Sequence, residues 1–88
     1  MLVKYEKSFL KDIQKLNNKK IAKRLQVLLE TFEENQNLQN TPNIKKLKGS
    51  NSYYRLKIAN YRLGFSYENN KIDIIRFLHR KDIYKLFP

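Results

Sequence analysis

Basic side chains recur along residues 53–84, whose sequence is YYRLKIANYRLGFSYENNKIDIIRFLHRKDIY. Arg55 and Lys57 alternate with apolar residues, and Arg62 does the same a few positions later. Arg80 follows the last apolar run, and tyrosines stand between the basic residues. Because successive side chains of a strand point to opposite faces, this alternation predicts a sheet with one cationic face. We predict that this face binds RNA phosphate groups.

Cations and tyrosines can cleave RNA at a ribose 2′-hydroxyl. That reaction needs a base for the hydroxyl, positive charge at the phosphorane and an acid for the leaving oxygen. Lysine and arginine supply the charge, a lysine or tyrosine with a lowered pKa can be the base, and His79 or a guanidinium can be the acid. Tyr53 and Tyr84 could stack on a base or orient the hydroxyl. The plainer alternatives are an outward strand position for Arg55 and Lys57, a partly exposed His79, and a Tyr84 that packs the C-terminus.

Other site chemistry finds little support in the sequence. The chain has one histidine, no cysteine and eight scattered carboxylates, so no ligand spacing indicates a metal site. Its two glycines form no phosphate-binding loop, and no motif indicates a serine triad. We therefore expect no metal and no cofactor.

The net charge is +11, from 19 Lys and Arg against 8 Asp and Glu in 88 residues. No Asp or Glu occurs between residues 35 and 67, so the excess is concentrated there. A patch without carboxylates cannot neutralise itself and favours a polyanionic partner. The alternative is a generic basic surface.

The length predicts one domain over residues 1–88. No apolar run approaches the roughly 18 residues that span a bilayer, and the N-terminal residues lack the apolar stretch of a signal peptide. We expect a cytoplasmic protein without a membrane partner.

The N-terminal half predicts a strand and two helices. Residues 2–5 alternate as a short strand, and Ser8 could cap a helix with an apolar stripe at helical spacing. A second helix is predicted over residues 19–34, so the two form a helical hairpin. Residues 35–43 are expected to be a loop.

The C-terminal half predicts a short helical turn at Ile44–Gly49 and then three strands over residues 54–58, 61–67 and 72–78, with a helical stub at 79–87. The third strand is apolar on both faces, which indicates a central or doubly covered position. The fold class is therefore α+β: an N-terminal strand, a helical hairpin and a three-stranded antiparallel meander, in one sheet with helices packed on one face.

Four short motifs occur in an order that resembles the RelE/ParE superfamily of bacterial type II toxins. They are KLKG at 46–49, YRLK at 54–57, NYRL at 60–63 and HRKDIY at 79–84. The resemblance covers nearly the whole chain and implies a RelE-like, microbial-RNase-like fold. It also implies an endonuclease that enters the ribosomal A site and cuts mRNA without a metal, by attack of the 2′-hydroxyl on the adjacent phosphate.

The resemblance assigns roles to residues at matching motif positions. Lys57 matches a candidate general base and Arg62 a phosphate-stabilising arginine. Arg80 matches a candidate acid or stabiliser of the leaving group, and Tyr84 a tyrosine that stacks on and orients the substrate. His79 stands where RelE itself has lysine, so either His79 or Arg80 could be the acid.

Arg55 replaces a family lysine and cannot act as a base, because a guanidinium stays protonated. It can still hold phosphate. The residues expected to bind RNA around the catalytic group are Lys45, Lys46, Lys48, Tyr53, Arg55, Arg76 and Lys81.

The resemblance also implies partners. These are the ribosome with its mRNA, and a cognate antitoxin that contributes an acidic or amphipathic segment. Two alternatives stay open: a ParE-like toxin that inhibits DNA gyrase, and an RNA-binding module without catalysis.

Overall fold

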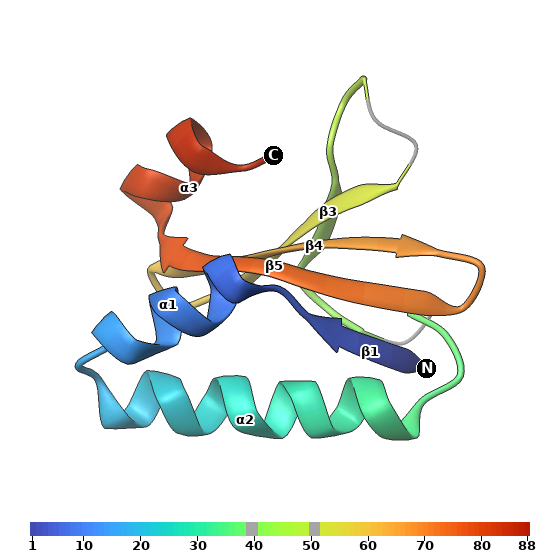
Figure 1. Cartoon of the computed structure of the whole chain (residues 1–88), viewed down its shortest axis with the longest axis horizontal. Helices are drawn as coiled ribbons and strands as arrows, with labels where there is room; N and C mark the ends of the chain where they lie inside the picture. The colour runs from blue at the N-terminus through green and yellow to red at the C-terminus, as the bar shows by residue number, and fades with distance from the viewer. Residues whose placement is uncertain (39–40, 50–51) are drawn as a thin grey trace.

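The computed structural model describes residues 1–38, 41–49 and 52–88. Within these residues, five strands form a single mixed sheet in the order β1-β5-β4-β3-β2 (Figure 1). Strand β1 runs parallel to β5, and the other neighbours are antiparallel. The elements in chain order are β1 (Leu2–Tyr5), α1 (Lys7–Lys15), α2 (Lys19–Glu34), β2 (Ile44–Lys46), β3 (Tyr53–Ile58), β4 (Tyr61–Glu68), β5 (Lys71–His79) and α3 (Arg80–Leu86).

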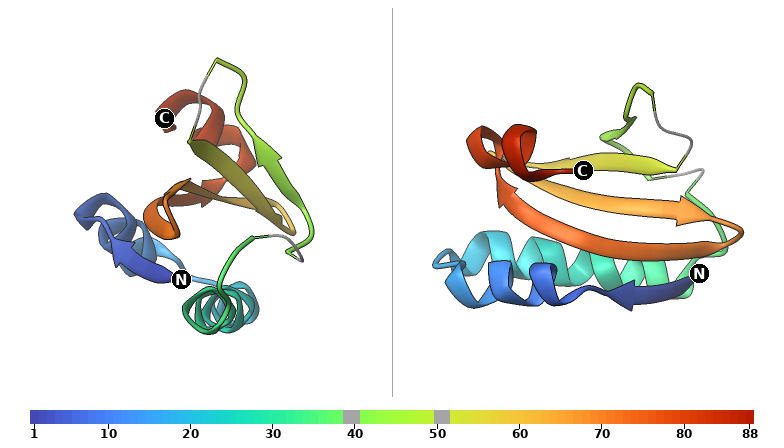
Figure 2. Two further views of the ribbon diagram at one scale, coloured as in Figure 1. Left: turned by 90° about the vertical axis from the view of Figure 1, so that its right-hand side faces the viewer. Right: turned by 45° about the horizontal axis from the view of Figure 1, so that its top comes forward.

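The helices divide between the two faces of the sheet. Helices α1 and α2 lie on one side, which we call the inner face, and α3 lies on the other side, the outer face (Figure 2). The inner face holds the core, in which Phe32, Leu63 and Phe65 are fully buried. The predicted α+β fold is confirmed, and the predicted C-terminal helical stub is α3. Its packing on the outer face differs from the expectation that the helices cover one face only (Figure 2).

Helix α2 has the predicted bounds. The Asn18 side chain accepts a hydrogen bond from the Ile21 N–H at 3.1 Å, which caps the first turn. Ile21, Leu25 and Phe32 form the buried stripe. Helix α1 starts at Lys7, and the predicted capping role of Ser8 is wrong, because the N-cap is Glu6 and it makes no side-chain cap bond.

The segment after the predicted loop is a strand and not the expected helical turn. (That loop includes residues 39 and 40, which lie outside the described residues.) Strand β2 pairs Ile44 with Leu56 and Lys46 with Tyr54, and the Lys57 N–H donates to the Asn43 carbonyl at 3.0 Å. So short a segment gains little from one helical turn, whereas pairing with β3 satisfies its backbone and covers a strand edge.

Both tight turns of the meander lie between the strand ranges predicted from the sequence. Asn69 and Asn70 have φ of 52° and 63°, the left-handed pair that suits a two-residue hairpin turn. Strand β5 lies between β1 and β4, an interior position that agrees with its apolar sequence.

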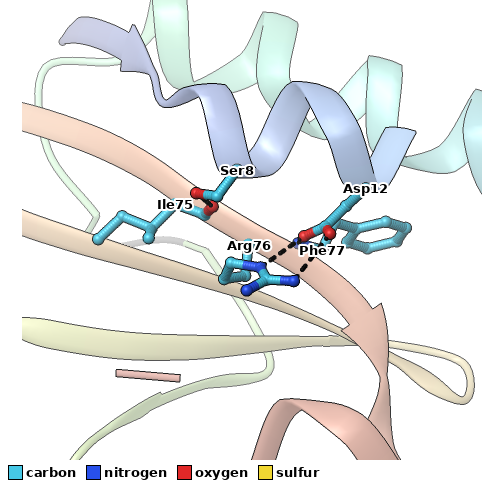
Figure 3. A network of polar contacts seen from close by, with 5 residues as sticks. All are labelled: Ser8, Asp12, Ile75, Arg76 and Phe77. Atoms are coloured by element: carbon cyan, nitrogen blue, oxygen red, sulfur yellow. Dashed lines mark hydrogen bonds and ion pairs between the residues drawn. The ribbon is translucent and has the colours of Figure 1, made fainter. Parts of the chain in front are cut away.

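Side chains of α1 satisfy the edge of β5 beyond the end of β1 (Figure 3). The Ser8 hydroxyl donates to the Ile75 carbonyl at 2.6 Å. Asp12 Oδ2 accepts from the Phe77 N–H at 2.9 Å and from Arg76 Nε at 2.8 Å, and its Oδ1 accepts from Arg76 Nη2 at 3.0 Å. These bonds replace the missing strand partner of β5, and the hydrogen bonds from Arg76 to the Asp12 carboxylate raise the pKa of Arg76. Because the guanidinium is held by Asp12, we assign Arg76 to the fold and leave it out of the RNA-binding group proposed below.

Replacing Asp12 with alanine should lower the free energy of unfolding by about 2–3 kcal/mol, because it leaves the Phe77 N–H and the half-buried Arg76 without their acceptor. Urea denaturation measures this change. Glu34→Ala removes an exposed carboxylate and should stay within about 0.5 kcal/mol of the wild type. Equal stability of the two variants would contradict the role of Asp12 at the sheet edge.

Candidate active site

A cleft of ≈ 340 Å³ opens on the outer face where β2, β3, β4 and α3 meet. We call it the cationic cleft, because its lining contains four basic residues and no carboxylate. The lining residues are Asn43, Ile44, Lys45, Arg55, Lys57, Arg62 and Tyr84. The alternation of apolar and basic residues in β3 and β4 produces it, since Leu56, Ile58 and Leu63 face the core.

The strand register sets basic side chains directly opposite one another. Lys57 of β3 is the cross-strand partner of Arg62 of β4, and Arg55 is the partner of Lys45 of β2. Like charges at opposed positions destabilise a sheet. The free protein therefore stores repulsion that a bound anion would relieve.

Backbone contacts fix the orientation of Arg62. Its Nη1 donates to the carbonyls of Ala59 at 3.1 Å and Tyr61 at 2.9 Å. A guanidinium has five N–H donors, so the remaining ones are available to an anion in the cleft. The β3–β4 turn thus positions the cation without using up its donors.

Helix α3 brings a tyrosine to the opposite wall. The Arg55 guanidinium carbon lies 4.7 Å from the centroid of the Tyr84 ring, a cation–π contact. Tyr84 is nevertheless 59% exposed, so its ring forms an accessible edge of the cleft. Arg80 lies four residues earlier in the same helix and is exposed, so it shares one side of α3 with Tyr84, although it is not among the residues that line the cleft.

His79 lies away from this group. Its Nδ1 accepts a hydrogen bond from the Lys81 N–H at 3.2 Å, which caps α3. Its ring packs edge-on against the Tyr61 ring, with the two centroids 5.7 Å apart. The Tyr61 ring stacks on Phe77 of the core, whereas the adjacent Arg62 faces the cleft. The His79 ring therefore lies on the face that holds Tyr61 and Phe77, and neither His79 nor Arg80 is among the residues that line the cleft.

The other predicted RNA-binding residues surround the cleft or lie apart from it. Lys45 lines it. The Lys46 ammonium lies 6.0 Å from the ring centroid of Tyr54, and Tyr53 packs edge-on against Phe87. Lys48 and Lys81 are exposed.

The sequence reasoning missed Asn43 and Ile44 as lining residues. The φ of 65° at Asn43 turns the chain from the loop into β2. The Pro42–Asn43 pair could have signalled this turn.

An acidic side chain lies on the sheet away from the cleft. Asp73 of β5 is the cross-strand partner of Lys4 and Ser66. Burial and the hydrogen-bonded Glu6 carboxyl raise the pKa of Asp73 to about 6 from 3.8. The same hydrogen bond lowers the pKa of Glu6 below 4.5.

Stability should fall as the pH rises from about 4 to about 6, because folded Asp73 keeps a proton that the unfolded chain has already lost. Glu6 acts in the opposite sense, and its contribution is lost only as the pH falls below 4.5. Asp73→Asn should remove this loss of stability between about pH 4 and about pH 6. The midpoint of urea denaturation, determined at a series of pH values, measures it. Asp82→Asn, a change at an exposed carboxylate, should keep it. If the stability of Asp73→Asn fell with rising pH as much as that of the wild type, Asp73 would not be the group responsible.

The described residues contain neither a metal-binding cluster nor a membrane-spanning helix. No three His, Cys, Asp or Glu side chains in residues 1–38, 41–49 and 52–88 gather so as to hold a metal ion. No helix in the same part of the chain is both long and apolar enough to cross a membrane.

A family model described as the ParE toxin of the type II toxin–antitoxin system parDE matches residues 3–84. The chain belongs to the RelE/ParE toxin superfamily. Toxin RelE3 of Methanocaldococcus jannaschii is 37% identical to this RelE/ParE toxin over the full length of both chains. The resemblance stated from the four motifs is thereby confirmed.

Solved structures of the family share the fold. The RelB–RelE antitoxin–toxin complex from Methanococcus jannaschii contains a chain with a TM-score of 0.84 and 35% identity, over 97% of this toxin and 99% of that chain. The archaeal RelE–RelB complex from Pyrococcus horikoshii OT3 gives a TM-score of 0.71 at 24% identity, over 90% and 93% of the two chains. This second likeness concerns the fold alone.

Proposed function

We propose that this RelE/ParE toxin is a ribosome-dependent mRNA endoribonuclease that cuts the codon in the ribosomal A site. The observation that carries the proposal is the cationic cleft, in which Lys57 and Arg62 lie directly opposite and Tyr84 faces Arg55. Such a cleft offers an RNA phosphate fixed donors and an aromatic surface for a base.

The reaction we propose is a transesterification within the RNA. The 2′-oxygen attacks the adjacent phosphorus, the bond from phosphorus to the 5′-oxygen breaks, and a 2′,3′-cyclic phosphate and a 5′-hydroxyl result. One proton leaves the 2′-hydroxyl and another reaches the 5′-oxygen, so no water is consumed in this step. Positive charge at the phosphorane lowers the barrier, and no metal takes part in this scheme.

The side chains of the cleft divide these tasks. Lys57 is the proposed base, and Arg62 holds the phosphorane oxygens. Arg55 contributes permanent charge, because a guanidinium cannot lose its proton at neutral pH. Arg80 stabilises the negative charge that develops on the leaving 5′-oxygen, which takes its proton from solvent water, and the place of Arg80 beside Tyr84 in α3 supports this role. Tyr84 stacks on a base and orients the ribose.

Basic residues outside the cleft would hold more distant phosphates of the mRNA or of ribosomal RNA. The net charge of +11 supports such contacts. We propose a cytoplasmic site of action, because the proposed substrate is mRNA on the ribosome. The proposed auxiliary group comprises Lys46, Lys48 and Lys81 outside the cleft, Lys45 in its lining, and Tyr53, whose ring could stack on a base.

The proposed partner that restrains the toxin is a cognate antitoxin with an acidic or amphipathic segment. Two relatives described above were solved as complexes with RelB. A basic cleft without its own carboxylates is suited to an acidic segment, which would compete with RNA for the same cations.

Gyrase inhibition is the second candidate, because the matching family model is described as a ParE toxin. The opposed cations of the cleft favour the nuclease. A non-catalytic RNA-binding module would use the same cleft without cutting.

A purified translation reaction with a defined mRNA tests the proposal, with and without ribosomes, beside a gyrase supercoiling assay. We expect mRNA cut only when ribosomes are present, and normal supercoiling. Intact mRNA with blocked supercoiling would show a gyrase inhibitor, and intact mRNA with tight RNA binding would show a binding module. Either result would overturn the proposal.

A further inference from the structure

The last aromatic side chain of the chain is seated on a glycine of the outer face. Gly64 of β4 points away from the core, and a Cβ built on it would lie 2.7, 2.8 and 2.9 Å from Cγ, Cδ2 and Cδ1 of Phe87. The phenyl ring therefore lies directly against the strand backbone. It is only 5% exposed, and Tyr53 packs edge-on against it with centroids 5.7 Å apart.

The last turn of α3 links the packing of Phe87 on Gly64 to the position of Tyr84. The Phe87 N–H donates to the Ile83 carbonyl at 3.0 Å and closes the final turn of α3. Ile83 is fully buried, so Ile83 and Phe87 fasten the same side of the helix to the sheet. Tyr84 stands between these two anchors in sequence, and its ring is directed to Arg55.

Helix α3 depends on those anchors for its position. It has seven residues, and a helix of that length is unstable on its own in water. Gly64 and Arg55 are direct cross-strand partners. The residue against which Phe87 packs therefore lies next to the residue that the Tyr84 ring contacts. A side chain on residue 64 would displace the ring and with it the last turn of the helix.

We infer that Phe87, seated on Gly64, is a positioning residue that holds Tyr84 over Arg55 in the cationic cleft. Phe87 is not among the residues that line the cleft, so its effect passes through Tyr84. The inference rests on the proposed nuclease function and adds the reason why position 64 is glycine. Positioning matters because a shift of about 1 Å in a catalytic group can cost about 10²-fold in rate.

Single-turnover cleavage on ribosomes programmed with a defined mRNA tests the inference, with the affinity for those ribosomes measured separately. We expect Phe87→Ala to slow cleavage by about 10- to 100-fold. We expect the Kd of Phe87→Ala for the programmed ribosomes to change less than about threefold, because the cations that bind phosphate remain. Phe87→Leu should restore most of the rate, since an apolar side chain again fills the seat.

The variant Tyr84→Ala separates positioning from general damage. In that background Phe87→Ala should cause no further loss of rate, because the group it positions is already gone. Gly64→Ala should slow cleavage about as much as Phe87→Ala does. The double variant should cleave at nearly the rate of Phe87→Ala alone, because the ring that the new Cβ would displace is already absent. Circular dichroism and thermal melting of each variant confirm that it is folded at the assay temperature.

Two outcomes would overturn the inference. One is wild-type cleavage by folded Phe87→Ala, and the other is an equal loss from Phe87→Ala with and without Tyr84. Absence of cleavage by the wild-type protein would instead refute the proposed function, so the two failures are distinguishable.

Discussion

Replacing Arg62 with alanine should reduce ribosome-dependent mRNA cleavage by about 10²- to 10³-fold, the usual cost of removing one fixed donor from a developing oxyanion. The guanidinium is held by the Ala59 and Tyr61 carbonyls, so its donors are already oriented before RNA arrives. The alanine variant loses both the charge and this preorganisation. Cleavage rates in single-turnover reactions measure the effect.

The fold should tolerate Arg62→Ala. The variant removes a cation that lies directly opposite Lys57, and relief of this repulsion offsets the loss of two hydrogen bonds. Lys71→Ala is a matched control, because Lys71 is an exposed strand cation outside the cleft, and it should cleave at nearly the wild-type rate. Full activity of a well-folded Arg62→Ala protein would remove Arg62 from the mechanism.

Two substitutions of Lys57 should separate its charge from its proposed role as a base. Lys57→Ala should lower the rate by about 10²- to 10⁴-fold, the range for loss of a general base. Lys57→Arg keeps a cation opposite Arg62, yet arginine cannot give up its proton at neutral pH. It should therefore bind programmed ribosomes like the wild type and still cleave slowly.

The outcome for Lys57→Arg decides the role of this residue. Slow cleavage with unchanged binding is the predicted result. Near-wild-type cleavage would show that Lys57 acts only by its charge, and another group would have to accept the 2′-hydroxyl proton.

The sequence was informative wherever local periodicity and packing agree. The stripe of Ile21, Leu25 and Phe32 predicted α2 with its observed bounds. Alternation along β3 and β4 predicted that Arg55, Lys57 and Arg62 share one face. In these elements one face is buried, so the pattern determines the direction of every side chain.

The features that the sequence did not predict depend on distant partners. Strand β2 exists because β3 offers it an edge, and three residues carry too little local signal to show this. Arg76 resembled the other basic residues until Asp12, 64 positions earlier, proved to hold it. His79 resembled a catalytic histidine in the sequence, but its ring packs edge-on against Tyr61 and its Nδ1 accepts a hydrogen bond from the Lys81 N–H at the start of α3.

Mapping of 5′ ends in cellular mRNA after induced expression tests the central claim most directly, with Arg62→Ala expressed at the same level as the comparison. The wild type should create new 5′ ends inside translated reading frames and none in untranslated RNA, and Arg62→Ala should create none. Growth arrest by the wild type without new ends in reading frames would contradict the account, and so would equal cutting of untranslated RNA.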